Sequence, residues 1–279
     1  MLTRSRLSDD VRRMADYEAS SYGDRIAAVY DQLRFPVTRF TNATVEFLAS
    51  VAGKRRVLEL GIGTGRIAVP LAAKGLKLFG IDASEKMVAQ MRAKAGGAAI
   101  PVVIGNFADL KVSGQFSLIY VVFNTFFALL TQDEQVRCFQ RAARHLTSDG
   151  VFLIEAFVPD SSRFDRGQRI GALDVETDYV RFEVTQHDPI TQSIRSAHVE
   201  VSENGVHLYP VRLRYALPAE LDLMARLAGM RLRTRYGGWN REPFTASSPF
   251  HVSLYELDPE KNLKTAKLSV RKLSSRRKK

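Results

Sequence analysis

The stretch Val57-Leu-Glu-Leu-Gly-Ile-Gly-Thr-Gly-Arg66 decides the fold, because its three glycines join a short apolar run to a helical pattern. A glycine-rich turn between a strand and a helix lets a ligand approach the backbone, and the helix N-terminus offers unpaired N–H groups. A dinucleotide site would have the spacing G-x-G-x-x-G, whereas this motif is G-x-G-x-G with Arg66 in the place of the third glycine. Glu59 would repel a pyrophosphate and suits a cationic ligand. The motif therefore favours a nucleoside that carries an amino acid.

Outward from this motif, the sequence alternates between strand and helix patterns. Apolar runs predict strands at 56–60, 76–81, 100–104, 116–122 and 151–155. Between them, helical periodicity predicts helices at 64–73, after the capping residue Ser84, and at about 132–146. This alternation implies parallel strands joined by right-handed crossovers, so we expect a doubly wound core.

The pattern changes to period two after Pro159. Antiparallel strands are indicated over the segments 180–185, 197–201 and 206–213. A helix from Pro218 and strands at 231–236 and 251–257 complete the pattern. We therefore expect an α/β fold, a doubly wound seven-stranded Rossmann-like sheet with an inserted antiparallel β meander. The meander should form a lid over the carboxyl ends of the strands, where ligands bind in such sheets.

Composition and charge exclude several classes. The net charge of +11 is concentrated after residue 259, where nine basic residues stand against one acid, so residues 1–259 carry only about +3. Nucleic acid is therefore not an expected partner. The single cysteine, Cys138, excludes an intrachain disulfide and a cysteine zinc site, and we expect it to be buried and no metal to be bound. With neither a spanning run nor a secretory signal, we expect a cytoplasmic protein.

The motifs, in this order, resemble those of the class I S-adenosylmethionine-dependent methyltransferases, strongly over 55–156 and more loosely over 217–257. Asp82 matches the family's ribose-binding acid, and Met87 matches a residue that packs on adenine. Asn106 stands where relatives usually have an aspartate that accepts from the adenine amino group, and its carbonyl can accept the same bond. The resemblance implies S-adenosylmethionine as cofactor, S-adenosylhomocysteine as product, and a cofactor site made of Tyr22, Tyr30, Glu59, Gly61, Gly63, Gly65, Arg66, Asp82, Ala83, Met87, Asn106, Phe107, Val122, Phe123 and Asn124.

Within that class, the chain is most similar to small-molecule enzymes, namely glycine N-methyltransferases and amino-sugar N,N-dimethyltransferases. The similarity lies in Tyr30-Asp31, in the end of the fifth predicted strand at 155–159, and in the inserted meander. It implies that Tyr30 helps close the site over the cofactor, with Tyr22 as the competing candidate. Some amino-sugar relatives have a histidine just past the fourth strand, whereas the segment 122–127 has none.

Methyl transfer from a sulfonium requires alignment and exclusion of water, and an amine acceptor needs only to be neutral. A hydroxyl acceptor usually needs a base, for which Glu155 and His187 are candidates beside Tyr30. Histidines of the meander are more often outward polar residues. We expect methyl transfer to nitrogen or oxygen of a small-molecule acceptor such as a sugar, an amino sugar or another secondary metabolite. An RNA-directed enzyme that uses the basic tail and a catalytically silent cofactor-binding protein remain alternatives, and a homodimer is left open.

The chain divides, on this interpretation, into four parts. We expect a helical segment at 1–54 that closes over the cofactor site, and a Rossmann-like core at 55–160 and 216–258. Residues 161–215 should form the inserted β lid, and residues 259–279 a basic disordered tail.

Overall fold

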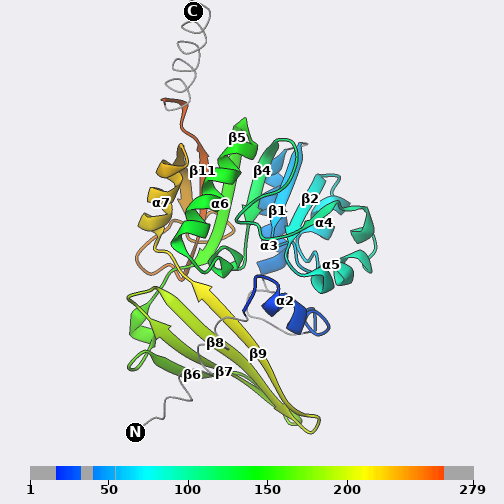
Figure 1. The fold of residues 1–279 in the computed structure, drawn as a ribbon, viewed down its shortest axis with the longest axis vertical. Coiled ribbons are helices and arrows are strands. Elements are labelled where there is room, and N and C mark those ends of the chain that lie inside the picture. The colour runs from blue at the N-terminus through cyan, green and yellow to red at the C-terminus, as the bar shows by residue number, and fades with distance from the viewer. Residues whose placement is uncertain (1–16, 33–39, 54, 261–279) are drawn as a thin grey trace, which may run out of the picture.

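The computed structural model describes residues 17–32, 40–53 and 55–260. Their main element is a seven-stranded sheet in the order β10-β11-β5-β4-β1-β2-β3 (Figure 1). Its strands are β1 (Arg56–Leu60), β2 (Lys77–Asp82), β3 (Val102–Ile104), β4 (Phe116–Val121), β5 (Leu146–Phe157), β10 (Met230–Tyr236) and β11 (Phe250–Leu257). Strands β1 to β5 are parallel, while β11 runs antiparallel to both β5 and β10. The predicted doubly wound, seven-stranded sheet is confirmed.

Helices cover both faces of this sheet, as a parallel sheet requires. They are α3 (Thr41–Ala52), α4 (Ala68–Ala73), α5 (Glu85–Arg92), α6 (Gln132–His145) and α7 (Pro218–Leu227), with the short α2 (Ser21–Ile26) before them. One apolar cluster joins α6 and α7 to the sheet and includes Cys138 and Phe139, and a second joins α3, α4 and α5 to its other face. Cys138 is fully buried, as expected. Every residue of the central strand β4 is buried between the two clusters.

Two predicted boundaries in the core were wrong. The helix expected from residue 64 begins only at Ala68, because the glycine turn keeps left-handed backbone as far as Gly65, with φ of +72°. The strand expected at 151–155 runs from Leu146 to Phe157, since Leu146 already pairs with Phe116 of β4, and the pairing with β11 continues to Phe157. By contrast, the Ser84 cap is confirmed: its hydroxyl accepts the Met87 N–H at 3.2 Å.

The inserted meander forms a separate four-stranded antiparallel sheet in the order β6-β7-β8-β9. Its strands are β6 (Gln168–Val175), β7 (Tyr179–Asp188), β8 (Ser193–Ser202) and β9 (Gly205–Arg214). Sequence periodicity missed β6, because its pairing with β7 shifts register between Ala172 and Asp174 and breaks the period-two pattern. The meander lies at the carboxyl ends of the parallel strands, and β9 contacts both α2 and the 3₁₀ turn η3 (Thr125–Ala128) that follows β4 (Figure 1).

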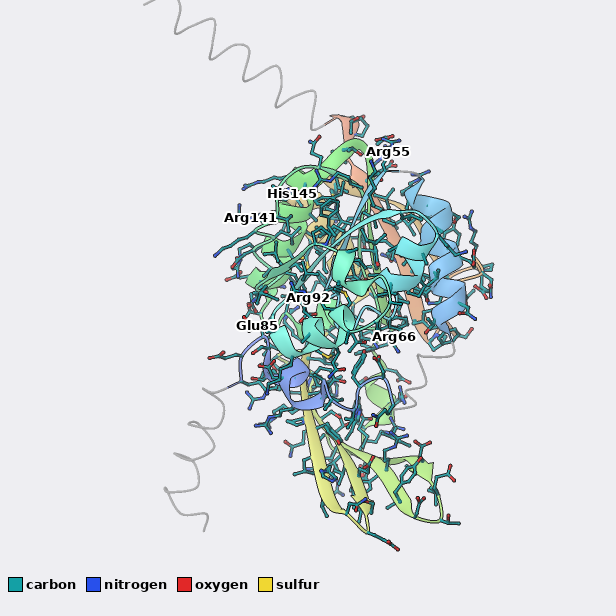
Figure 2. All side chains as sticks on the ribbon, turned by 90° about the vertical axis from the view of Figure 1, so that its right-hand side faces the viewer. Arg55, Arg66, Glu85, Arg92, Arg141 and His145 are labelled. Carbon is teal, nitrogen blue, oxygen red and sulfur yellow. The ribbon has the colours of Figure 1, made fainter. Side chains whose placement is uncertain are left out.

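Side-chain positions mark the two ends of the core. Arg66, which follows the glycine turn, lies at the end next to the meander, while Arg55 and His145 lie toward the opposite end (Figure 2). Within the described residues, no helix is long and apolar enough to cross a membrane, and no group of three potential metal ligands occurs.

Candidate active site

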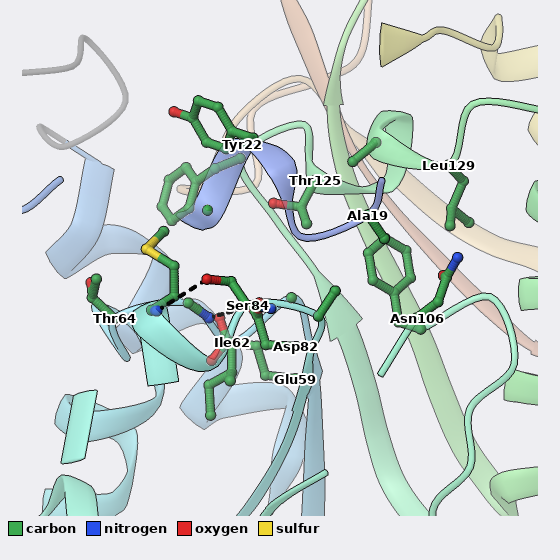
Figure 3. A pocket seen from close by; sticks show the side chains of 18 of the residues that line it. Ala19, Tyr22, Glu59, Ile62, Thr64, Asp82, Ser84, Asn106, Thr125 and Leu129 are labelled. Carbon is green, nitrogen blue, oxygen red and sulfur yellow. Dashed lines mark hydrogen bonds between the residues drawn. The ribbon is translucent and has the colours of Figure 1, made fainter. Parts of the chain in front are cut away.

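A cavity of about 470 Å³ opens where β1, β2 and β4 end (Figure 3). Its size lies within the range of small-molecule sites. Of the predicted cofactor-binding residues, all but Gly65 and Asn124 line this cavity. The lining residues that the sequence analysis did not assign to the site are Tyr17, Glu18, Ala19, Gly23, Ile62, Thr64, Ile67, Ser84, Thr125, Ala128, Leu129, Leu130 and Glu134.

The glycine turn brings bare backbone to the floor of the cavity. A Cβ on Gly61 would lie 2.4 Å from Cγ2 of Thr125, and the positive φ of Gly61 and Gly63 also disfavours a side chain. Gly65 has a different reason to be glycine, because a Cβ there would lie 2.4 Å from Cγ of Met91 on α5. Its role is close packing of helix against turn, which explains why it does not line the cavity.

Asp82 ends β2 beside this turn. Its Oδ2 accepts the Gly63 N–H at 2.7 Å, and its Oδ1 accepts the Ser84 N–H at 2.8 Å. Burial raises the pKa of the carboxyl above its ordinary value, against the backbone donors that favour the charged form. The carboxylate therefore orders the turn and also faces the cavity, where its remaining lone pairs can accept two hydroxyl groups.

Glu59 lies one strand away, at the end of β1. Its carboxyl group is buried and accepts the Tyr120 hydroxyl at 2.8 Å. Burial raises the pKa of Glu59 to about 8, although the hydrogen bond from Tyr120 and the charge of Arg66 both lower it. Near neutral pH this group is therefore largely protonated, and a cation placed in the cavity would favour its ionised form.

Arg66 stands between two aromatic rings. Its guanidinium carbon lies 4.2 Å from the centre of the Phe123 ring and 5.6 Å from that of Tyr30, and Nη2 donates to the Tyr30 hydroxyl at 3.3 Å. Burial raises the pKa of Tyr30, so its phenol stays neutral. The site thus contains one oriented cation that can pair with a carboxylate.

The N-terminal segment closes this end of the cavity through polar contacts with distant residues. The Ser84 hydroxyl donates to Asp24 at 2.6 Å, and the Thr64 hydroxyl donates to Asp31 at 2.7 Å. Asp31 also forms an ion pair with Lys94 at 2.6 Å. Gly23 is needed for the close approach, because a Cβ there would lie 2.6 Å from that of Ser84. Tyr22 lines the cavity from this segment, so the sequence-predicted competitor of Tyr30 is in the site together with it (Figure 3).

Asn106 and Leu129 lie together at one end of the cavity (Figure 3). The Asn106 side chain uses its oxygen locally, to accept the Ala108 N–H at 2.8 Å, and its amide donates to Glu134 at 3.3 Å. Glu134 also completes the capping box of α6 with Thr131. A carboxylate therefore stands beside the position where relatives have an aspartate, brought there by the packing of α6. The capping pattern Thr131-x-x-Glu134 can be read from the sequence. The contact between Glu134 and Asn106 cannot, because it depends on how α6 packs.

Of the three candidate catalytic groups, the structure brings only Tyr30 to the cavity wall. Glu155 is buried on β5, where its carboxylate accepts the Phe123 N–H. His187 lies in the meander, stacked on Phe164 with 4.5 Å between ring centres and hydrogen-bonded through Nε2 to the Tyr215 hydroxyl at 2.9 Å. Neither Glu155 nor His187 is among the described residues that line the cavity, nor is any residue of β6 to β9.

Fold and cavity together define an α/β protein with a cavity for a small molecule at the carboxyl ends of its parallel strands. Comparison with known proteins gives the class. Residues 57–150 match a family model described as a methyltransferase domain. The structure is similar to that of the CcbJ methyltransferase from Streptomyces caelestis, with a TM-score of 0.81 and 40% identity over 86% of this chain and 99% of the other. The chain belongs to the S-adenosylmethionine-dependent methyltransferases. S-adenosylmethionine is its cofactor.

Two further relatives extend the comparison. The cypemycin N-terminal methyltransferase of a Streptomyces species is 28% identical over 197 residues, which are 70% of this chain and 80% of that protein. The sugar N-methyltransferase KedS8 from a Streptoalloteichus species has a TM-score of 0.60 at 17% identity, over 82% of this chain and 93% of the other. The second likeness shows the fold alone.

Proposed function

We propose that this methyltransferase transfers a methyl group to nitrogen or oxygen of a small-molecule acceptor, with an amine nitrogen favoured. The observation that carries the proposal is the closure of the cavity by the N-terminal segment. Asp24 and Asp31 fasten this segment to Ser84, Thr64 and Lys94. Part of the wall is then formed by Tyr17, Glu18, Ala19, Tyr22 and Gly23. An acceptor must fit beside the cofactor in a cavity of about 470 Å³, which suits a metabolite or a chain terminus rather than a duplex.

The lining residues fit the three parts of the cofactor. Asp82 would accept from both ribose hydroxyls at the end of β2. Arg66 would pair with the carboxylate of the methionine part, and Glu59 would oppose its cationic groups. Phe107 and Leu129 would enclose the adenine, with the amino group of the base near Asn106 and Glu134. This arrangement needs no residue of the meander, which would act as a support for α2 through β9.

The acceptor would approach from the aromatic end of the site. Tyr22, Tyr30 and Phe123 wall this end. Burial raises the pKa of both tyrosines, so each presents a neutral phenol. A phenol oxygen can accept an amine N–H and thereby turn the nitrogen lone pair toward the methyl group. The cypemycin enzyme, whose name specifies an N-terminal acceptor, supports nitrogen as the target.

The work left to the protein is alignment and exclusion of water. The cofactor supplies an electrophilic methyl group on a sulfonium, and transfer requires the acceptor, the methyl carbon and the sulfur to lie in line. Gly61 and Asp82 fix the nucleoside, while the rings of Tyr22 and Phe123 exclude water from the reacting atoms. An amine that enters neutral needs no group of the protein to take its proton before transfer.

The test is a methylation assay with matched acceptors. Purified protein and S-adenosylmethionine would be incubated with amines, including amino sugars, with the corresponding alcohols, with a short peptide that has a free amino terminus, and with total RNA. We expect products heavier by one CH₂ from the amines. Asp82→Ala serves as the negative control because it removes the ribose acceptor. Transfer only to RNA, or binding of the cofactor without transfer to any acceptor, would support the alternative functions instead.

A further inference from the structure

The chain leaves β4 through an uncommon backbone turn. Phe123 and Asn124 are consecutive residues with φ of +57° and +64°, a left-handed conformation that non-glycine residues seldom adopt and almost never in succession. Such a conformation persists only where its surroundings hold it in place. Phe123 lines the cavity, so whatever holds this turn also shapes the site.

Two groups on β5 hold the turn. The Glu155 carboxylate accepts the Phe123 N–H, and the Asn124 side-chain oxygen accepts the Phe157 N–H at 2.7 Å. Glu155 and Phe157 point to the same side of β5, two residues apart at the strand's carboxyl end. Strand β5 is itself fixed on both sides, by β4 and by β11, where Val252 pairs with Glu155. The Glu155 carboxylate is therefore held by a strand that is paired on both sides, and it fixes the turn through its hydrogen bond to the Phe123 N–H.

The Phe123–Asn124 turn also positions Arg66, the cation of the site. The Phe123 ring lies 4.2 Å from the Arg66 guanidinium carbon, and Arg66 donates to the Tyr30 hydroxyl. A contact chain thus leads from Glu155 through Phe123 to Arg66. Glu155 itself is not among the residues that line the cavity, and its carboxylate accepts the Phe123 N–H instead.

We propose that Glu155 is a positioning residue, whose ionised carboxylate holds the Phe123–Asn124 turn and thereby sets Phe123 and Arg66 for cofactor binding. This inference rests on the cofactor site proposed above. It replaces the role of general base, for which the sequence made Glu155 a candidate.

The buried position of Glu155 makes its hydrogen bond to the turn sensitive to pH. Burial raises the pKa of its carboxyl to about 7, against the N–H groups of Phe123 and Asn124 and the charge of Arg66. The positive charge of Arg66 lowers the pKa of Glu155, and it also lowers the pKa of Glu59. Because protonation weakens the carboxyl as an acceptor, the turn is held less firmly below pH 7. Cofactor affinity should rise as the pH increases through about 7.

The test measures cofactor binding without an acceptor, so that protonation of an amine substrate plays no part. Calorimetry would follow S-adenosylhomocysteine binding between about pH 5.5 and 9 for the wild type, Glu155→Gln and Glu155→Met. Hydrogen exchange of the peptide that spans residues 121–127 would report on the turn directly. The glutamine keeps an acceptor oxygen but cannot ionise, whereas the methionine has a similar size and no acceptor.

We expect Glu155→Gln to keep affinity within about threefold of the wild type at pH 8 and to lose the change near pH 7. Glu155→Met should weaken binding by about tenfold or more and speed exchange of the Phe123 amide by a similar factor, as expected for the loss of a charge-assisted hydrogen bond. Glu59→Gln is the matched control. Burial raises the pKa of Glu59 to about 8, so ionisation of Glu59 should add a second rise in affinity near pH 8; this substitution should remove that rise and leave the one near pH 7.

Three results would overturn the inference. One is a Glu155→Gln variant that binds the cofactor normally with the same pH dependence but has lost turnover, which is the behaviour of a base. A second is a pH profile or exchange rate that neither substitution alters. A third is Glu155→Gln with exchange of the Phe123 amide about tenfold faster than in the wild type, and this comparison can be made even if Glu155→Met fails to fold. Absence of binding by the wild type would instead indicate that the proposed cofactor site is wrong.

Discussion

Replacement of Asp82 by alanine perturbs the site at the point where turn and cofactor meet. The carboxylate already accepts the Gly63 and Ser84 N–H groups, and the proposed site adds two ribose hydroxyls to the same oxygens. The substitution therefore removes the ribose acceptor and also leaves two backbone donors of the glycine turn without their charged partner. Affinity and stability should both fall, for separate reasons.

The size of each effect follows from these hydrogen bonds. Loss of hydrogen bonding to a charged acceptor costs about 1.5–3 kcal/mol, which corresponds to a roughly ten- to hundredfold loss of affinity. In the absence of cofactor, water in the cavity that Gly63 and Ser84 line would partly replace the lost carboxylate, which offsets part of the cost to the turn. A loss of about 1–2 kcal/mol in the free energy of unfolding would lower Tm by only a few degrees for a protein of this size. Affinity should thus fall by about tenfold or more, while the protein stays folded.

Calorimetric titration with S-adenosylhomocysteine and a thermal melt of the same samples measure both quantities. Asp149→Ala is the matched control, because Asp149 is exposed, pairs with Arg55 and lies far from the cavity. We expect the control to bind as the wild type does. A folded Asp82→Ala protein with unchanged affinity would refute the assignment of this residue to the ribose.

Further predictions concern other parts of the site and the tail. Because a cationic ligand lowers the raised pKa of Glu59, binding of S-adenosylmethionine at pH 7 should release protons, and calorimetry in buffers of different ionisation enthalpy should detect them. Glu59→Gln should reduce the release and leave the part that comes from Glu155. Glu134→Gln should weaken binding of the adenine nucleoside by about fivefold to tenfold, as the loss of one such hydrogen bond implies, and Asn106→Asp should not reproduce that loss. Deletion of residues 260–279 should leave turnover of a small acceptor unchanged and reduce retention on heparin at low salt; a loss of turnover would show that the tail contributes to the site.

The parts of the fold that could be predicted are those determined by neighbours in sequence. The glycine motif, the apolar runs of the parallel strands and the Ser84 cap are local patterns, and each is confirmed. The start of α4 was wrong because helical periodicity begins before the backbone can leave the glycine turn. Strand β6 was missed because its register shift removes the alternation that identifies a strand.

The site was predictable where it follows from the ends of parallel strands and not where it depends on packing. Asp82 and Glu59 end their strands, so the topology alone brings them together. The wall formed by residues 17–23 depends on contacts such as that between Asp24 and Ser84, which lie 60 positions apart in sequence. Glu134 reaches Asn106 only through the placement of α6. Gly23, between a tyrosine and an aspartate, was the one local sign of a close approach.

The most direct test of the central claim is to follow the methyl group itself. S-adenosylmethionine labelled with ¹³C in the methyl group would be turned over with an acceptor that carries both an amine and a hydroxyl, and the product would be examined by ¹H–¹³C correlation NMR. We expect a single new resonance with the shift of an N-methyl group, dependent on Asp82. A resonance of an O-methyl group alone, or label that appears only in RNA or remains on the cofactor, would contradict transfer to the nitrogen of a small molecule.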